Sequence, residues 1–180
     1  MQKLKLMLLI YILTISDAFP DNLFGMKIYE NAYSYFSKNV FVNKRKDPET
    51  KKGFYNVNIS DFISEKNKSP YFKSYFITID KYYNIHGIDG RQSYFSLEQC
   101  MIVAKNIKKI LDKKYDIKLE FHKDTYPSFR THFFENYTEN KNRVAINCNH
   151  YLKDNEIEMV IFLISYDLQL EIENFYQSGF

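Results

Sequence analysis

Cys148 and His150 are the residues whose types and spacing first suggest chemistry, in the stretch RVAINCNHYL at positions 143–152. A thiol near an imidazole can be a nucleophile with its base, two ligands of a metal, or one half of a disulfide beside an unrelated histidine. Residues two apart on a strand share a face, but they lie roughly 7 Å from each other. A general base must lie within about 3 Å of the group that it deprotonates. The spacing therefore argues against a nucleophile unless another histidine approaches Cys148.

The two cysteines of the sequence, Cys100 and Cys148, are better explained as a disulfide. Cys100 falls on the apolar stripe of a predicted helix, and Cys148 falls on the apolar face of a predicted strand that this helix could cover. An even number of cysteines in an exported chain is the setting in which disulfides persist. Closing a loop of this length would contribute on the order of 4 kcal/mol in the chain-entropy model. Two buried free thiols are the alternative.

The four histidines are His86, His122, His132 and His150, and no pair has the HExxH or Cys/His spacing of a metal site. We therefore predict no metal site and no cofactor. His122 and His132 could meet on adjacent strands of one polar sheet face, although isolated histidines on a sheet surface are commoner. The sequence also lacks a phosphate loop, a dinucleotide fingerprint and a nucleophile elbow.

A polar sheet face is the best candidate for binding. If the C-terminal strands form a meander, six polar side chains could converge on it, and an arginine among amides and imidazoles would suit an anionic or polar ligand. The alternative is a solvated face, or a face packed under a loop. The predicted binding residues are Glu120, His122, Arg130, His132, Asn147 and Asn149.

One long helix is the clearest element that would position these groups. The SLEQ stretch matches a capping box, in which Ser96 accepts from the backbone amide of Gln99. An apolar stripe follows, so we expect the helix to continue to about Tyr115. Shorter helices are expected near the N terminus, over residues 26–38, and near the C terminus, over residues 167–176.

Alternating apolar and polar residues predict a series of strands. Residues 74–80 and 84–89 are expected to form a hairpin, and residues 157–165 are apolar on both faces, so we place them in the middle of the sheet. Few helices and no βαβ alternation indicate an α+β fold with a mostly antiparallel sheet packed by the long helix. The remaining strands are expected at residues 54–60, 117–123, 128–134 and 143–150.

The N terminus has the layout of a secretory signal peptide over residues 1–18, with two lysines, an uncharged apolar run and small residues before the cut. The apolar run is shorter than the about 20 residues that a membrane-spanning helix needs. We therefore predict a periplasmic or secreted protein whose residues 19–180 form a single domain. The formal net charge is +3, and lysines and acids are interspersed, which argues against nucleic acid as a partner.

The stretches DNLFGMKIYENA, GFYNVNIS and YQSGF make the chain resemble small uncharacterised secreted proteins of AT-rich bacteria. This resemblance implies a periplasmic address, and it brings no known activity and no functional residue to the sequence. From the residues, we expect a non-catalytic module that binds a protein partner or a small polar ligand. A hydrolytic enzyme that uses His132 with Glu120 or Asp124 is the alternative.

Overall fold

The computed structural model describes residues 21–48, 50 and 53–177. The predicted signal peptide at residues 1–18 lies outside these residues. Among the described helices, none is both long and apolar enough to cross a membrane.

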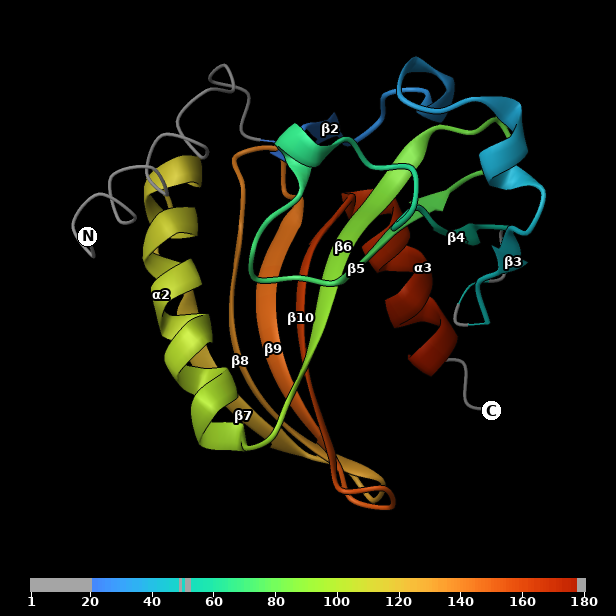
Figure 1. Ribbon diagram of the computed structural model, residues 1–180. Coiled ribbons are helices and arrows are strands. Elements are labelled where there is room, and N and C mark those ends of the chain that lie inside the picture. Colours follow the sequence, from blue (N-terminus) through green and yellow to red (C-terminus); the bar gives the residue numbers. More distant parts are fainter. Residues whose placement is uncertain (1–20, 49, 51–52, 178–180) are drawn as a thin grey trace.

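An eight-stranded antiparallel sheet dominates the fold (Figure 1). The order of its strands is β3-β4-β5-β6-β10-β9-β8-β7, so consecutive strands are neighbours except where β6 pairs with β10. The expected α+β class with a mostly antiparallel sheet is confirmed. The strands are β3 (Arg45–Lys46), β4 (Tyr55–Asn58), β5 (Ser74–Ile79), β6 (Ile85–Tyr94), β7 (Glu120–Thr125), β8 (Phe129–Tyr137), β9 (Arg143–Tyr151) and β10 (Glu156–Ile164).

The apolar strand β10 lies inside the sheet, between β6 and β9, as its sequence indicates. Alternate residues of this strand point to opposite faces of the sheet. We call the face that carries Ile146 and Cys148 of β9 the helix face. The opposite face, which carries Asn147 and Asn149, is the groove face.

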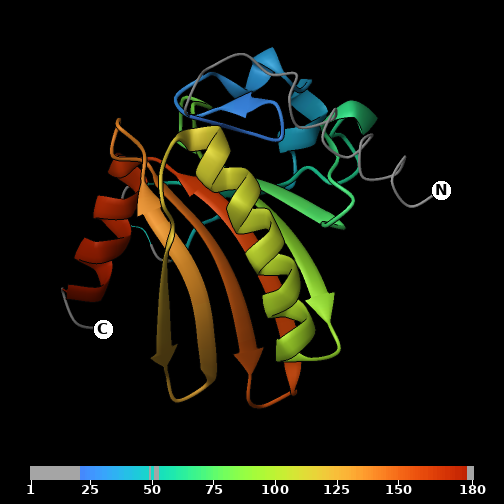
Figure 2. The same cartoon turned by 90° about the vertical axis from the view of Figure 1, so that its left-hand side faces the viewer.

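The long helix α2 (Leu97–Tyr115) lies against the helix face, where it contacts β9 and β10 (Figure 2). Its N-cap forms as expected, since the Ser96 hydroxyl accepts from the amide of Gln99 at 3.2 Å. Cys100 in its first turn is bonded to Cys148 of β9, and both cysteines are fully buried. This disulfide joins helix and sheet across the core, as the sequence predicts.

The N-terminal segment differs from the expected α-helix over residues 26–38. It forms a small two-stranded sheet of β1 (Asn22–Leu23) and β2 (Met26–Lys27), followed by two short 3-10 helices, η1 (Ala32–Ser34) and η2 (Lys38–Phe41). The 3-10 helix η1 begins where Asn31 accepts from the amide of Tyr33, and the amides of Tyr29 and Ala32 donate to the carbonyls of Ile85 and Tyr83, at the start of β6 and in the loop before it. Tertiary hydrogen bonds thus replace the helical ladder that the apolar spacing suggests.

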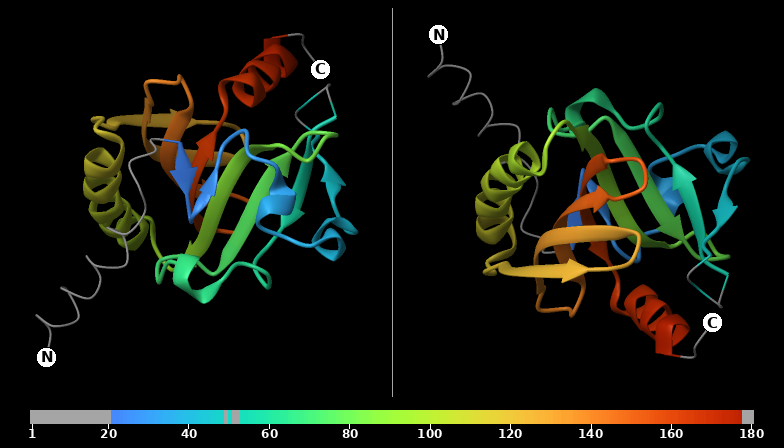
Figure 3. Two further views of the ribbon diagram at one scale, coloured as in Figure 1. Left: turned by 90° about the horizontal axis from the view of Figure 1, so that it is seen from above. Right: turned by 90° about the horizontal axis from the view of Figure 1, so that it is seen from below.

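This N-terminal segment covers the same sheet face as α2. Gly90 of β6 lies on the helix face opposite Ile161, and a Cβ on this glycine would lie only 2.8 Å from the ring of Phe24. The C-terminal helix α3 (Tyr166–Gln177) lies on the other side of the sheet (Figures 1 and 3). Within the part of the chain that the structure describes, α3 is the helix that lies on the groove face, and it covers one end of it.

Candidate functional site

The six predicted binding residues do not converge on one face. In the register of β7, β8 and β9, His132 pairs with Cys148 and with Lys123, which places it on the helix face. Arg130, two residues before it, shares that face. The other four lie on the groove face, so the expected cluster is wrong. The four are Glu120, His122, Asn147 and Asn149.

The same register excludes the predicted partnership of His122 with His132. His122 pairs with Phe133 and its ring stacks on that of Phe133 at 5.2 Å between centroids. His132 points to the opposite face, where burial and the charge of Lys123 lower its pKa. For the same reason His132 does not share a face with Glu120 or Asp124, so the pairing expected for a hydrolase does not form.

Asn147 and Asn149 line an open groove of about 530 Å³ that crosses the groove face. Its walls come from strands β4 to β10 and from α3, so residues far apart in the sequence meet there. This groove is the candidate binding site. The residues that carry its chemistry are Asp89, Arg91, Thr131, Asn147, Asn149, Tyr151 and Glu158.

A row of oxygen-bearing side chains forms the polar floor of the groove. Glu158 of β10 lies opposite Asn149 of β9, and Asn149 lies opposite Thr131 of β8. Residues directly opposite each other on antiparallel strands have their Cβ atoms about 4.5–5.5 Å apart. Asp124 of β7, opposite Thr131, and Ser93 of β6, opposite Glu158, extend this row at its two ends.

Three oxygens on this floor have no hydrogen-bond partner among the described residues, although each is buried. They are Oγ1 of Thr131, Oδ1 of Asn147 and Oδ1 of Asn149. The exposed fraction is only 4% for Thr131 and 9% for Asn149. Leaving a buried polar group unpaired costs about 1–3 kcal/mol. A ligand that donates hydrogen bonds would recover this energy.

Charged groups stand beside this floor. The guanidinium of Arg91 donates from Nε to Oδ1 of Asp89 at 2.7 Å. Burial raises the pKa of Asp89, and the charge of Arg91 opposes this shift. Burial also raises the pKa of Glu158, against the charge of Arg91 and a hydrogen bond with Tyr151. Carboxylates thus face the groove in surroundings that favour pairing with a positive charge.

The end of the groove near α3 is apolar. Val160, Phe162 and Ile164 are the groove-face residues of β10, and Leu168 and Ile172 approach them from α3. The helix α3 begins directly after β10, so the first turn of the helix lies next to the last groove-face residues of the strand. The site therefore combines a polar floor with an apolar end.

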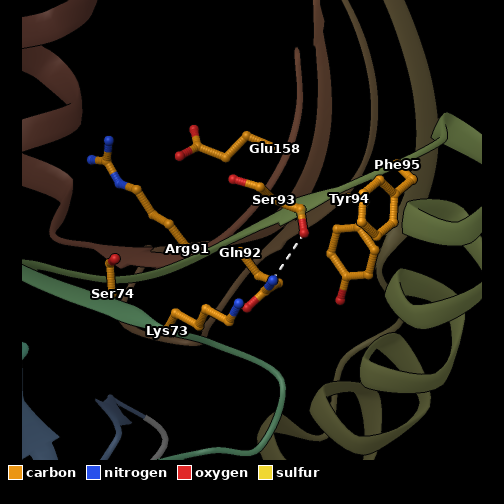
Figure 4. A pocket seen from close by; sticks show the side chains of 8 residues that line it. All are labelled: Lys73, Ser74, Arg91, Gln92, Ser93, Tyr94, Phe95 and Glu158. Carbon is orange, nitrogen blue, oxygen red and sulfur yellow. Dashed lines mark hydrogen bonds between the residues drawn. The ribbon is translucent and has the colours of Figure 1, made fainter.

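A smaller cavity of about 360 Å³ adjoins the groove (Figure 4). Arg91 and Glu158 line both cavities, and Figure 4 shows Tyr94 and Phe95 at the end that lies toward α2. The polar end of the groove therefore continues into a second recess, and Arg91 and Glu158 stand where the two meet.

A serine, a histidine and an aspartate also meet at the start of α3. Nδ1 of His86 lies 3.0 Å from Oγ of Ser165, and Nε2 lies 3.5 Å from Oδ2 of Asp80. The Ser165 hydroxyl also accepts from the amide of Leu168, as an N-cap does. Since Ser165 is fully buried and lines neither cavity, this arrangement fastens α3 to β6 and presents no nucleophile to a substrate.

Cys148 has no free thiol, because it is bonded to Cys100. His150 lies at the end of β9, where Nε2 is 2.8 Å from Oδ1 of Asn155 in the following turn. Among the described residues, no group of three or more His, Cys, Asp or Glu side chains could hold a metal ion.

Sequence reasoning found two of the groove residues and missed the others. Thr131 and Glu158 lie directly opposite Asn149 on the two neighbouring strands. The alternation of side chains along β8 and β10 would therefore have placed them on the groove face if the register of the strands had been known. Arg91 and Asp89 lie beyond β10, on a strand that sequence reasoning paired only with β5. Comparison of the chain with family models, with curated proteins and with solved structures finds no match.

Proposed function

We propose that this protein is an exported, non-catalytic binding module whose small ligand occupies the groove. The single observation that carries the proposal is the set of buried oxygens on the groove floor that have no hydrogen-bond partner within the described ranges of the chain. Folding alone gains nothing from these atoms, because each gives up hydrogen bonds to water without finding a partner in the protein. Their positions on the two neighbouring strands β8 and β9 suit a ligand that supplies the missing donors.

The shape of the groove also supports binding. Its volume of about 530 Å³ falls in the range of about 300–1,000 Å³ that is usual for small-molecule sites. Its floor is made by strands inside the sheet, which hold their side chains in fixed positions. Polar groups at one end and apolar groups at the other would also fix the direction in which a ligand lies.

Nuclear magnetic resonance of the purified, ¹⁵N-labelled protein tests this function. A chemically diverse library of small molecules should contain compounds that shift the amide signals of Thr131, Asn149 and Glu158. Signals of residues on the helix face, such as Ile161, serve as the internal control. The proposal fails if no compound shifts the groove signals selectively.

Export is part of the proposal, and the buried disulfide supports it. Disulfides persist in oxidising compartments and are rare in the cytosol. Fractionation of cells that express the full chain should recover the protein outside the cytoplasm, shortened at its N terminus, with neither cysteine open to alkylation. A cytoplasmic product with two alkylated thiols would contradict export.

A further inference from the structure

We infer that the groove recognises its ligand through an ammonium group, with the apolar body of the same molecule lying against α3. This inference rests on the proposed binding function and specifies the chemical class of the ligand. Three independent features of the groove lead to it: the hydrogen-bonding character of its floor, its balance of charges and the apolar lining at one end.

The floor offers acceptors. The unpaired atoms are the Asn147 and Asn149 side-chain carbonyl oxygens and the hydroxyl oxygen of Thr131, and the carboxylate of Glu158 lies next to them in the row. An ammonium group has three N–H donors and no acceptor, so it could bond to several of these oxygens at once. An anion such as a phosphate would instead lie beside the carboxylates of Glu158 and Asp124, whose negative charge would repel it.

The charges of the groove favour a cation. Both arginines that line it are already paired, Arg91 with Asp89 and Arg143 with Glu135. Glu158, in contrast, forms no ion pair within the described part of the chain, and Asp124 adds a second carboxylate at the end of the row. A positive group beside Glu158 would add a charge-assisted hydrogen bond to the one that this carboxylate accepts from Tyr151.

The apolar end of the groove indicates the chemical character of the rest of the ligand. Val160 and Phe162 continue from Glu158 along the same face of β10, and Leu168 of α3 lies over the far end. A ligand with its ammonium at Glu158 would therefore extend along these side chains toward the helix. An amine with an aryl or alkyl body meets this requirement better than a sugar, whose hydroxyl groups would lie unpaired at the apolar end.

Isothermal titration of the purified protein with 2-phenylethylamine tests the inference. We expect the amine to bind at least about tenfold more tightly than 2-phenylethanol, which has the same body but no charge. Glu158→Gln should weaken amine binding by about tenfold or more. The matched control is Glu156→Gln on the same strand, since Glu156 is exposed and lines neither cavity. This variant should change the affinity less than about twofold.

Equal affinity for the amine and the alcohol, or an unchanged affinity in Glu158→Gln, would overturn the inference. Tighter binding of a neutral disaccharide or of an anionic aryl phosphate at the groove signals would also overturn it, while leaving the proposed binding function intact. If no member of the diverse library bound in the groove, both the ammonium inference and the proposed binding function would be contradicted. Circular dichroism of each variant confirms that a lost affinity does not reflect unfolding.

Discussion

The two faces of the sheet use the same strands for opposite purposes. On β10, Met159, Ile161 and Leu163 point to the helix face and are buried almost completely. Glu158 and Val160 alternate with them on the groove face and are only half-buried. The helix face is closed by α2, the N-terminal segment and the disulfide, whereas among the described residues α3 covers one end of the groove face and leaves the rest open.

This difference separates stability from recognition within one sheet. Apolar burial on the helix face supplies the free energy of folding, at roughly 25 cal/mol for each Å² removed from water. The groove face leaves polar oxygens that no other described residue pairs with, and so it gives up part of that free energy. Substitutions on the two faces should therefore change the free energy of unfolding by different amounts, and one substitution on the groove face should raise it.

Removing the disulfide should have the largest effect, because it acts on the helix face and on the unfolded chain together. The bonded cysteines are 48 positions apart. In the chain-entropy model, Cys100→Ala with Cys148→Ala should lower the free energy of unfolding by about 4 kcal/mol. Urea denaturation measures this change. Reductant should destabilise the wild type and leave the double variant unchanged, and an unchanged midpoint in the double variant would contradict the prediction.

Neighbouring residues of β10 give the next test of the two faces. Ile161→Ala on the helix face should lower the free energy of unfolding by about 3 kcal/mol, since the residue is 2% exposed and a cavity would remain. Val160→Ala on the groove face should cost about 1 kcal/mol, because its side chain borders an open groove. Equal losses in urea denaturation would show that the two faces are packed alike.

Two buried threonines of the groove face should differ in the sign of their effect. Oγ1 of Thr78 donates to Oδ1 of Asn56 at 2.7 Å, whereas Oγ1 of Thr131 has no partner among the described residues. We expect Thr78→Val to lower the free energy of unfolding by about 1 kcal/mol and Thr131→Val to raise it by up to about 1 kcal/mol. Thermal unfolding of both variants in the absence of ligand measures the difference. A loss of stability in Thr131→Val would mean that this hydroxyl is paired in solution.

The attachment of α3 to β6 should make stability depend on pH, with the smallest effect. Burial lowers the pKa of His86, and the charge of Asp80 opposes this shift. The folded state therefore binds a proton less readily than the unfolded state, whose histidines titrate near about 6.5. The free energy of unfolding should consequently decrease as the pH falls below about 6.5.

Urea denaturation across this pH range, compared between wild type and His86→Gln, isolates the contribution of this imidazole. The pH dependence should be smaller in the variant, which keeps a polar side chain at this position. An identical pH dependence in the two proteins would show that His86 does not contribute to it.

The fold was largely predictable from local pattern, and the particular elements show why. The capping residue Ser96 and the apolar stripe behind it define α2 within one segment, and the apolar residues Val144, Ile146 and Cys148 at every second position indicate β9. Residues 26–38 were mispredicted because their helical spacing competes with hydrogen bonds to the loop before β6, which lies more than 40 residues away. Local sequence preference therefore determines α2 and the predicted strands, whereas tertiary contacts determine the conformation of residues 26–38.

The site was less predictable, because side-chain direction depends on register. His132 and Asn147 looked like members of one polar face, yet a shift of one residue in pairing moves a side chain to the other face. The two asparagines were found because they flank Cys148. Since Cys148 points toward α2, its neighbours in the strand point to the opposite face. Glu158 was missed because it is the third residue of a strand whose residues from Met159 onward are all apolar.

The sequence by itself determined the long helix, most of the strands, the antiparallel α+β class and the pair of cysteines that join helix to sheet. The elements and the fold class follow from hydrophobic periodicity and helix capping, which are properties of single segments. The disulfide follows from the even number of cysteines and from their places on apolar faces. Only the tertiary structure decided that β10 lies beside β6, and so that Glu158 meets Arg91 at the end of a groove floored by Asn149 and Thr131. The physical reason is that pairing between distant strands is set by the packing of the whole core, which no short stretch of sequence contains.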